Sequence, residues 1–164
     1  MNGIKTLGCY SEFKSLNINK RVQVFLMYIL RRLEISDYEL FYPLINEFRK
    51  TDFTKEEFEE TLIYMNQYSD IWVVEHNKDL IGTATIIYEQ KFIFNRCILA
   101  HIEDVCVKET YRRKGIGRLL VQKLIEEAKT KKCYKITLDC ATHNIPFYTA
   151  CGLETRGTQM TCLL

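Results

Sequence analysis

The chain has 164 residues, 47% of them hydrophobic and 27% charged, which is the composition of one ordinary globular domain. Its 23 basic and 21 acidic residues leave a formal net charge of +2, too balanced to indicate nucleic acid or an acidic membrane surface as a partner. Seven scattered cysteines without a C-x-x-C pair argue against a disulfide framework and a zinc site, so we expect a reducing, cytoplasmic setting and no metal.

The N-terminal segment predicts a tail followed by a strand. Residues 1–21 are polar and irregular, so we expect a tail that is either disordered or draped on a single domain over 22–164. The apolar run at 22–30 has the length of a signal-peptide core, but Arg31 and Arg32 follow it directly. It is also too short to span a membrane, and we interpret 22–33 as strand-like.

Two capping boxes then predict the starts of two helices. The first runs from Ser36 to Glu39 and opens a helix that continues through Phe48. The second runs from Thr54 to Glu57 and opens another helix with an apolar inner face. Both boxes are followed by apolar residues at helical spacing, which supports the assignment.

The rest of the chain alternates strands with helices. We predict strands at 71–75, 80–89, 97–107 and 133–140, turns or loops at 77–79 and 92–96, and helices from 116 and over 144–152. With a last strand at the end, the order is β-α-α-β-β-β-α-β-α-β. Strands that feed a central helix and return imply a mixed α/β sheet flanked by helices.

The basic segment at 112–118 is the strongest candidate for a binding site. Gly115 and Gly117 stand at a predicted helix start, directly after Arg112, Arg113 and Lys114. Bare backbone N–H groups, the helix dipole and basic side chains together form a cradle for phosphate or pyrophosphate. The glycine spacing matches neither a P-loop nor the dinucleotide fingerprint. A basic turn before a surface helix is the alternative interpretation.

The pattern R-x-x-G-x-G at 112–117 resembles the pyrophosphate-binding loop of the GNAT superfamily of acyl-CoA N-acyltransferases. Supporting blocks are His-Ile-Glu-Asp at 101–104, Cys-Tyr-Lys-Ile-x-Leu-Asp-Cys at 133–140 and Asn-x-x-Phe-Tyr-x-x-Cys-Gly-Leu at 144–153. Together they are similar to the glucosamine-6-phosphate N-acetyltransferase family, and the resemblance covers about 28–160. It implies a central mixed, mostly antiparallel, twisted sheet with splayed fourth and fifth strands and about four helices.

The resemblance also implies the ligands and the assembly. Acetyl-CoA would be the cosubstrate, held by the 112–117 loop and between the splayed strands. A phosphorylated amino sugar would be the acceptor, in a homodimer with shared active sites. The expected cofactor-binding residues are Val105, Cys106, Val107, Arg112, Arg113, Lys114, Gly115, Ile116, Gly117, Arg118, Asn144 and Tyr148.

The resemblance also implies roles for three expected catalytic residues, Tyr148, Asp104 and Glu103, and for a backbone amide. Tyr148 would protonate the leaving thiolate, because a phenol with a pKa near 10 stays protonated at neutral pH. An amide near Val105 or Val107 would stabilise the oxyanion. Glu103 and Asp104 are neighbours in a strand, so they point to opposite faces unless a bulge intervenes. Asp104 would act as a base or hold a water, with bulk solvent as the other candidate base.

The acceptor site is the less complete part of the resemblance. The expected substrate-binding residues are Lys91, Glu103, Asp104, Lys135 and Asp139. Relatives place an arginine near the C-terminus to meet the sugar phosphate, but residues 160–164 here contain no basic residue. Arg49, Lys50 or Arg156 would have to replace it. His101 is expected to be structural. The alternatives are a GNAT enzyme for another amine, such as a protein N-terminus, a lysine or a polyamine, and a non-catalytic acyl-CoA-binding module.

Overall fold

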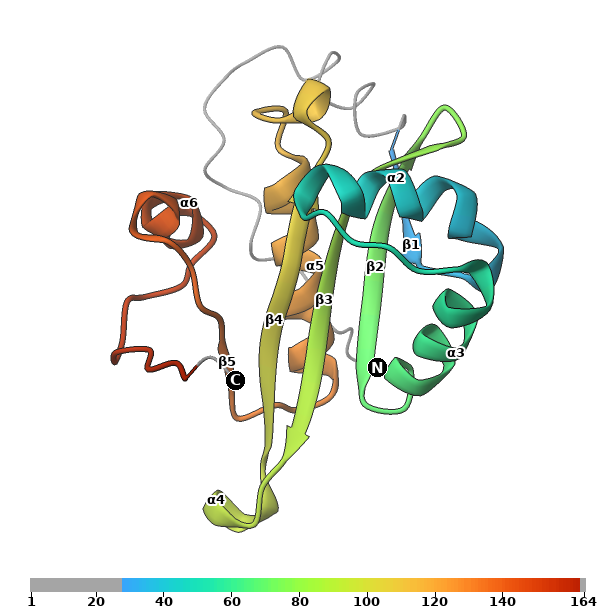
Figure 1. The fold of residues 1–164 in the computed structure, drawn as a ribbon. Helices are drawn as coiled ribbons and strands as arrows, with labels where there is room; N and C mark the ends of the chain where they lie inside the picture. The colour runs from blue at the N-terminus through green and yellow to red at the C-terminus, as the bar shows by residue number, and fades with distance from the viewer. Residues whose placement is uncertain (1–27, 163–164) are drawn as a thin grey trace, which may run out of the picture.

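The computed structural model describes residues 28–162, which form a five-stranded sheet covered by helices (Figure 1). The strands are β1 (Ile29–Arg32), β2 (Ser69–His76), β3 (Asp79–Gln90), β4 (Ile98–Val107) and β5 (Lys135–Thr137). They lie in the sheet in chain order, antiparallel except for the parallel pair β4 and β5. The predicted mixed, mostly antiparallel α/β sheet is therefore confirmed.

Helices pack on both faces of this sheet. The helices of the described chain are α2 (Tyr38–Phe48), α3 (Lys55–Met65), α4 (Ile93–Arg96), α5 (Ile116–Thr130) and α6 (Ile145–Ala150), with short 3-10 turns η1 (Ile35–Asp37), η2 (Glu109–Tyr111) and η3 (Thr142–Asn144). Of these, α4 lies at the tip of the β3–β4 hairpin and α6 beside β4 (Figure 1). Helix α5 covers one face and buries Leu120 and Leu124 against the sheet, whereas α2 and α3 cover the other with Leu44 and Phe58 (Figure 1). The apolar spacing seen in the sequence thus produces two cores, one on each face.

Close packing of α5 on β3 positions the start of α5. Gly82 lies under this helix, and a Cβ atom added there would meet the Cys106 carbonyl oxygen and the Ile116 Cγ2 atom, both at 3.1 Å. A larger residue would push the helix away, since packed interiors tolerate little added volume. Gly82 therefore holds the beginning of α5 against the end of β4.

The two predicted capping boxes have different outcomes. The box from Thr54 to Glu57 is confirmed, with both reciprocal hydrogen bonds present. The box at Ser36 is wrong, because the reciprocal bonds join Glu34 and Asp37 around η1, and α2 begins only at Tyr38. The Asp37 carboxylate accepts two 2.7 Å hydrogen bonds from Arg31 of β1, so a residue of the neighbouring strand stabilises this turn.

The predictions for the last two strands and for the N-terminal segment have different outcomes. The strand expected over 133–140 shortens to the three residues of β5. The last expected strand is wrong for the described chain, because 153–162 follow α6 without entering the sheet. The tail at 1–21, and 22–27 of the first expected strand, lie outside the described residues. Within 28–162, none of the helices has the length and apolar character needed to cross a bilayer.

Candidate active site

Strand β4 carries a bulge at Asp104 and Val105, which together face the single β3 residue Ala84. Asp104 has a left-handed backbone conformation with a φ of 50°. An extra residue of this kind interrupts the ladder, sharpens the local twist and redirects backbone and side-chain groups. The bulge expected on the fourth strand is therefore present, at the position of the acid pair.

The bulge places both carboxyl groups on one face of the sheet. Glu103 lies directly opposite Thr85 in the ladder, and Asp104 lines the same cavity as Thr85 beneath α2 and α3. Neighbouring residues in a regular strand would point to opposite faces. The bulge therefore makes Glu103 and Asp104 available to one ligand.

Strands β4 and β5 pair only at their beginnings. The ladder joins Leu99 to Lys135 and ends where His101 meets Thr137, which is the last residue of β5. Strand β4 continues six residues further, to Val107. Within residues 28–162, no strand lies beside one edge of 102–107, so backbone groups of this edge can bond a ligand that lies there as an extra strand.

His101 connects β4 and β5 at the end of their ladder. Its Nδ1 atom is 2.8 Å from Thr137 Oγ1, and its Nε2 atom is 2.8 Å from Glu103 Oε1. Asp139, just after β5, has its Oδ2 atom 3.9 Å from the same nitrogen. His101, which was expected to be structural, thus lies between the carboxyl groups of Glu103 and Asp139. The signal in the sequence was its spacing, because residues two apart in a strand share a face with each other.

Helix α6 contributes Tyr148 from the opposite side of the open edge. The phenol is half-buried, and burial raises its pKa, with further upward contributions from Cys140, Cys151 and Glu103. The contribution of Glu103 reflects how close α6 comes to β4, although 45 residues separate the two in the chain. The phenol therefore stays protonated at neutral pH, as a proton donor requires.

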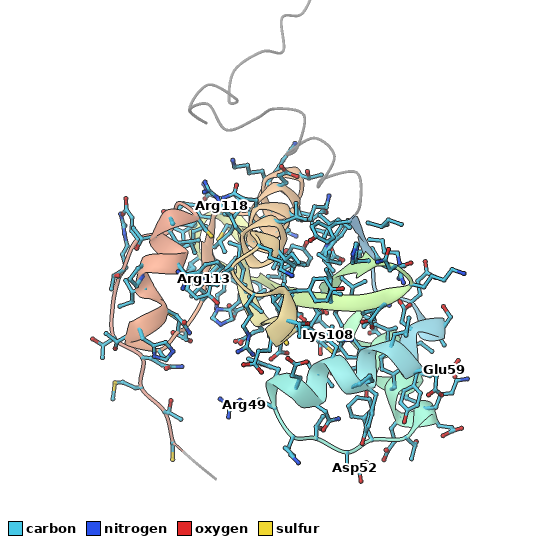
Figure 2. The ribbon with its side chains drawn as sticks, turned by 90° about the horizontal axis from the view of Figure 1, so that it is seen from above. Arg49, Asp52, Glu59, Lys108, Arg113 and Arg118 are labelled. Carbon is cyan, nitrogen blue, oxygen red and sulfur yellow. The ribbon has the colours of Figure 1, made fainter. Side chains whose placement is uncertain are left out.

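The 112–117 loop builds an anion cradle at the beginning of α5. Gly115 is the residue before the helix and has a φ of 88°, a conformation that L side chains rarely adopt. No side chain caps the helix, so its first backbone N–H groups remain available. Figure 2 shows Arg113 and Arg118 on the side of this helix start that faces α6. Gly117 is required for packing, since an added Cβ would lie 3.2 Å from the Phe147 ring.

Some expected cofactor-binding residues face away from this cradle. The side chains of Cys106 and Ile116 are 4% and 1% exposed and belong to the two cores, which leaves only their backbone groups for a cofactor. Arg112 donates a hydrogen bond from Nε to the Val107 carbonyl at 3.2 Å, and Lys114 lies over the Tyr111 ring. Val105 and Val107 pack toward α5. Asn144 is exposed at the beginning of α6.

The end of α2 brings a positive charge to the bulge. Partial burial raises the pKa of the Asp104 carboxyl, and the charge of Arg49 lowers it in part. Arg49 ends α2 and is exposed, and Figure 2 shows its side chain projecting beyond that helix. Arg156, the other arginine considered, is engaged by Glu154 at 3.1 Å. Of the two arginines considered, Arg49 is therefore the one whose charge acts on Asp104, and Lys50 follows it on the surface.

The structure does not bring the two expected lysines to the acid pair. Lys91 follows the end of β3, pairs with Glu89 and bonds its backbone N–H to Cys97 at the hairpin tip. It is four strand positions from Ile87, the β3 partner of His101, which is about 13 Å of strand. Lys135 is exposed at the beginning of β5. Among the described residues, no group of three or more His, Cys, Asp or Glu side chains is arranged to hold a metal ion.

Comparison with known proteins gives consistent matches. Residues 33–153 match the model of the acetyltransferase (GNAT) family. The chain is 34% identical over 138 residues to glucosamine 6-phosphate N-acetyltransferase from Arabidopsis thaliana, covering 80% of this chain and 93% of that protein. It is also 34% identical over 141 residues to glucosamine 6-phosphate N-acetyltransferase 1 from Dictyostelium discoideum, covering 82% and 89%. The crystal structure of glucosamine-6-phosphate N-acetyltransferase from Arabidopsis thaliana matches with a TM-score of 0.80 at 32% identity, covering 83% and 97%.

Proposed function

Because this chain belongs to the acetyltransferase (GNAT) family, we propose that it transfers the acetyl group of acetyl-CoA to the amine of D-glucosamine 6-phosphate. The observation that carries this proposal is the meeting of Tyr148, the β4 bulge and the acid pair at one open strand edge. The names of the curated relatives supply the acceptor.

The donor occupies the open edge of β4. Its pyrophosphate binds the N–H groups at the beginning of α5, beside Arg113 and Arg118, and its pantetheine amides bond the free backbone of 102–107. The thioester oxygen then faces an amide of the bulged strand, near Val105 or Val107. A backbone amide of this kind stabilises an oxyanion by about 3 kcal/mol, because the N–H group is already oriented when the charge develops.

The reaction proceeds in one ternary complex. The neutral amine attacks the thioester carbon, a C–N bond forms and the C–S bond breaks. The amine loses its extra proton to Asp104, directly or through a water, and the departing thiolate receives a proton from Tyr148. Glu103 and Asp139, held by His101, bind sugar hydroxyls, which positions the amine for attack.

Arg49 binds the sugar phosphate, because its charge acts on Asp104 at the bulge. In an Arg49→Ala variant we expect the KM for glucosamine 6-phosphate to rise about tenfold, because one charge-assisted contact with the phosphate is lost. Glucosamine lacks the phosphate, so its much weaker turnover should not change. Both are measured by thiol release from acetyl-CoA.

The matched control is Arg156→Ala, which removes an exposed arginine outside the acid group. A lysine peptide and spermidine, tested with the native chain, separate the sugar acceptor from other amines. Turnover of either one in preference to glucosamine 6-phosphate would leave the family intact and reject the acceptor. An unchanged KM in the Arg49 variant would reject only the role of Arg49.

The β3–β4 hairpin supports a homodimer with shared active sites. Its tip projects from the body of the protein (Figure 1) and exposes Phe92, Ile93 and Phe94 at 97%, 60% and 58%. Phe94 stacks on Tyr134, the residue just before β5, with ring centroids 4.7 Å apart. Such an exposed apolar tip is typical of an interaction surface. We propose that it docks on a second copy and carries Lys91 to the partner's sugar site.

Mixing two inactive variants tests this arrangement. We expect Lys91→Ala and Tyr148→Phe proteins each to be nearly inactive, since each damages both sites of its own dimer. After mixing and exchange, a mixed dimer holds one site with both native residues, so about a quarter of native activity should return in a symmetric assembly with random pairing. Absence of recovery, with exchange verified by differently tagged copies, would reject the shared site.

We further propose that this single catalytic domain works in the cytoplasm and supplies the synthesis of UDP-N-acetylglucosamine. The six described cysteines are free thiols, which fits a reducing compartment. The balanced charge of the whole chain favours neither nucleic acid nor an anionic membrane as a partner.

A further inference from the structure

A cavity of about 210 Å³ lies between the sheet and the helices α2 and α3. Eight of the twelve residues that line it are apolar, among them Phe41, Phe58 and Met65, and three more are threonines. A cavity of 150 Å³ with an apolar lining is known to take a benzene ring, so this one holds a ring with a short chain attached. Its lining is far more apolar than an amino-sugar phosphate requires.

The cavity begins at the catalytic bulge. Its floor includes Thr83 and Thr85, the two β3 residues on either side of Ala84, which faces the bulge. Asp104 lines it as well, and is the charged member among the described residues around it. The next residue, Val105, carries one of the amides proposed to face the thioester oxygen. A molecule that fills the cavity therefore ends beside the acetyl group.

A single carboxyl group, that of Asp104, is the polar charged feature among the described residues that line this cavity. Asp104 is exposed on one side, and Arg49 is the nearby charge that offsets it in part. Partial burial raises the pKa of the Asp104 carboxyl, which also makes it a better acceptor for a proton. The opening therefore suits an ammonium group, and the interior suits an apolar tail.

We propose that this cavity is a second acceptor subsite, and that the protein also acetylates primary amines carrying an aromatic or short alkyl tail. The tail lies among Phe41, Phe58 and Met65, and the ammonium group contacts Asp104. Asp104 accepts one proton, the neutral amine attacks the thioester carbon, and the C–N bond forms as the C–S bond breaks, while the acylated nitrogen gives its second proton to water. The thiolate takes the proton of Tyr148, so the products are the N-acetyl amine and CoA.

The test uses 2-phenylethylamine beside glucosamine 6-phosphate, both with acetyl-CoA. Thr61 of α3 lines the cavity but is exposed, so a Thr61→Trp change adds a ring at the wall of the cavity from a surface position. We expect the native chain to acetylate 2-phenylethylamine, and the Trp variant to lose about tenfold in kcat/KM for it. Its kcat/KM for glucosamine 6-phosphate should stay within about twofold of native.

A Glu60→Trp variant is the matched control, because Glu60 is exposed on the same helix and does not line the cavity. The proposal would be overturned if 2-phenylethylamine is not acetylated and does not compete with the sugar. Equal losses for both acceptors in the Thr61 variant would also overturn it. The native chain could instead use butyryl-CoA better than acetyl-CoA, with this preference lost in the Thr61 variant. That result would overturn the proposal and assign the cavity to the acyl chain of the cosubstrate. The sugar assay with native protein tests the main function independently.

Discussion

A Tyr148→Phe variant is expected to lose about 100-fold or more in kcat while its KM for acetyl-CoA stays nearly constant. The phenol donates its proton only as the C–S bond breaks, so its removal affects the transition state and not the binding of the donor. The phenyl ring keeps the packing of α6 on the core that includes Tyr148. Initial rates of thiol release at saturating acceptor measure the effect.

The pH profile adds a second readout for Tyr148. Burial raises the pKa of this phenol above its ordinary value near 10. The donor form is the protonated one, so activity should persist through pH 9 and fall only as the pH rises through the raised pKa. The variant should lack this alkaline fall.

A Tyr64→Phe change is the matched control, because it also removes one hydroxyl group and Tyr64 is 62% exposed on α3. Both variants should unfold at nearly the native temperature. A Tyr148 variant with kcat within about threefold of native would remove the proton-donor role. Tight acyl-CoA binding by a native chain that turns over none of the tested amines would instead favour the non-catalytic module.

The second large effect is expected at Gly115, where an alanine should raise the KM for acetyl-CoA about tenfold or more. The residue has a φ of 88°, and an L residue held there costs roughly 1–2 kcal/mol. The loop relieves this strain by moving, which turns the N–H groups at the beginning of α5 away from the pyrophosphate. Steady-state kinetics with acetyl-CoA as the varied substrate measure the change.

Two comparisons isolate the contact with pyrophosphate. Gly157 has a φ of 73° and open space around it, so Gly157→Ala introduces similar strain away from the cradle. It should lower stability by a similar amount and leave the KM for acetyl-CoA unchanged. S-acetylpantetheine lacks the pyrophosphate, so the Gly115 variant and the native chain should use it equally well. A defect of equal size with both donors would show that Gly115 acts elsewhere.

Local features of the sequence predicted the parts of the site that lie within a short stretch of chain. The R-x-x-G-x-G loop, the Thr54 capping box and the acid pair each depend on residues a few positions apart. A helix start with a glycine before it exposes N–H groups wherever the helix is placed. This is why the anion cradle was predicted before its surroundings were known.

Contacts between distant residues decided the features that were missed. At η1, the box joins Glu34 and Asp37 in place of the one predicted at Ser36, and Asp37 is also bound by Arg31 of β1, which pairs with Glu75 of β2. The role of His101 depends on Thr137, which reaches it only because β5 pairs with β4. The distance of Lys91 from the acid pair likewise follows from the length of the hairpin.

The sequence by itself determined the mixed sheet, the order of most of its elements, the glycine at the start of α5 and the family to which the chain belongs. Periodicity, turn residues and short motifs act over a few residues and persist in any arrangement of the chain. Only the tertiary structure decided that the bulge turns Glu103 and Asp104 to one face, beside Arg49 and an apolar cavity. Strand register and helix packing join residues far apart in the chain, and the shape of the acceptor side depends on those contacts.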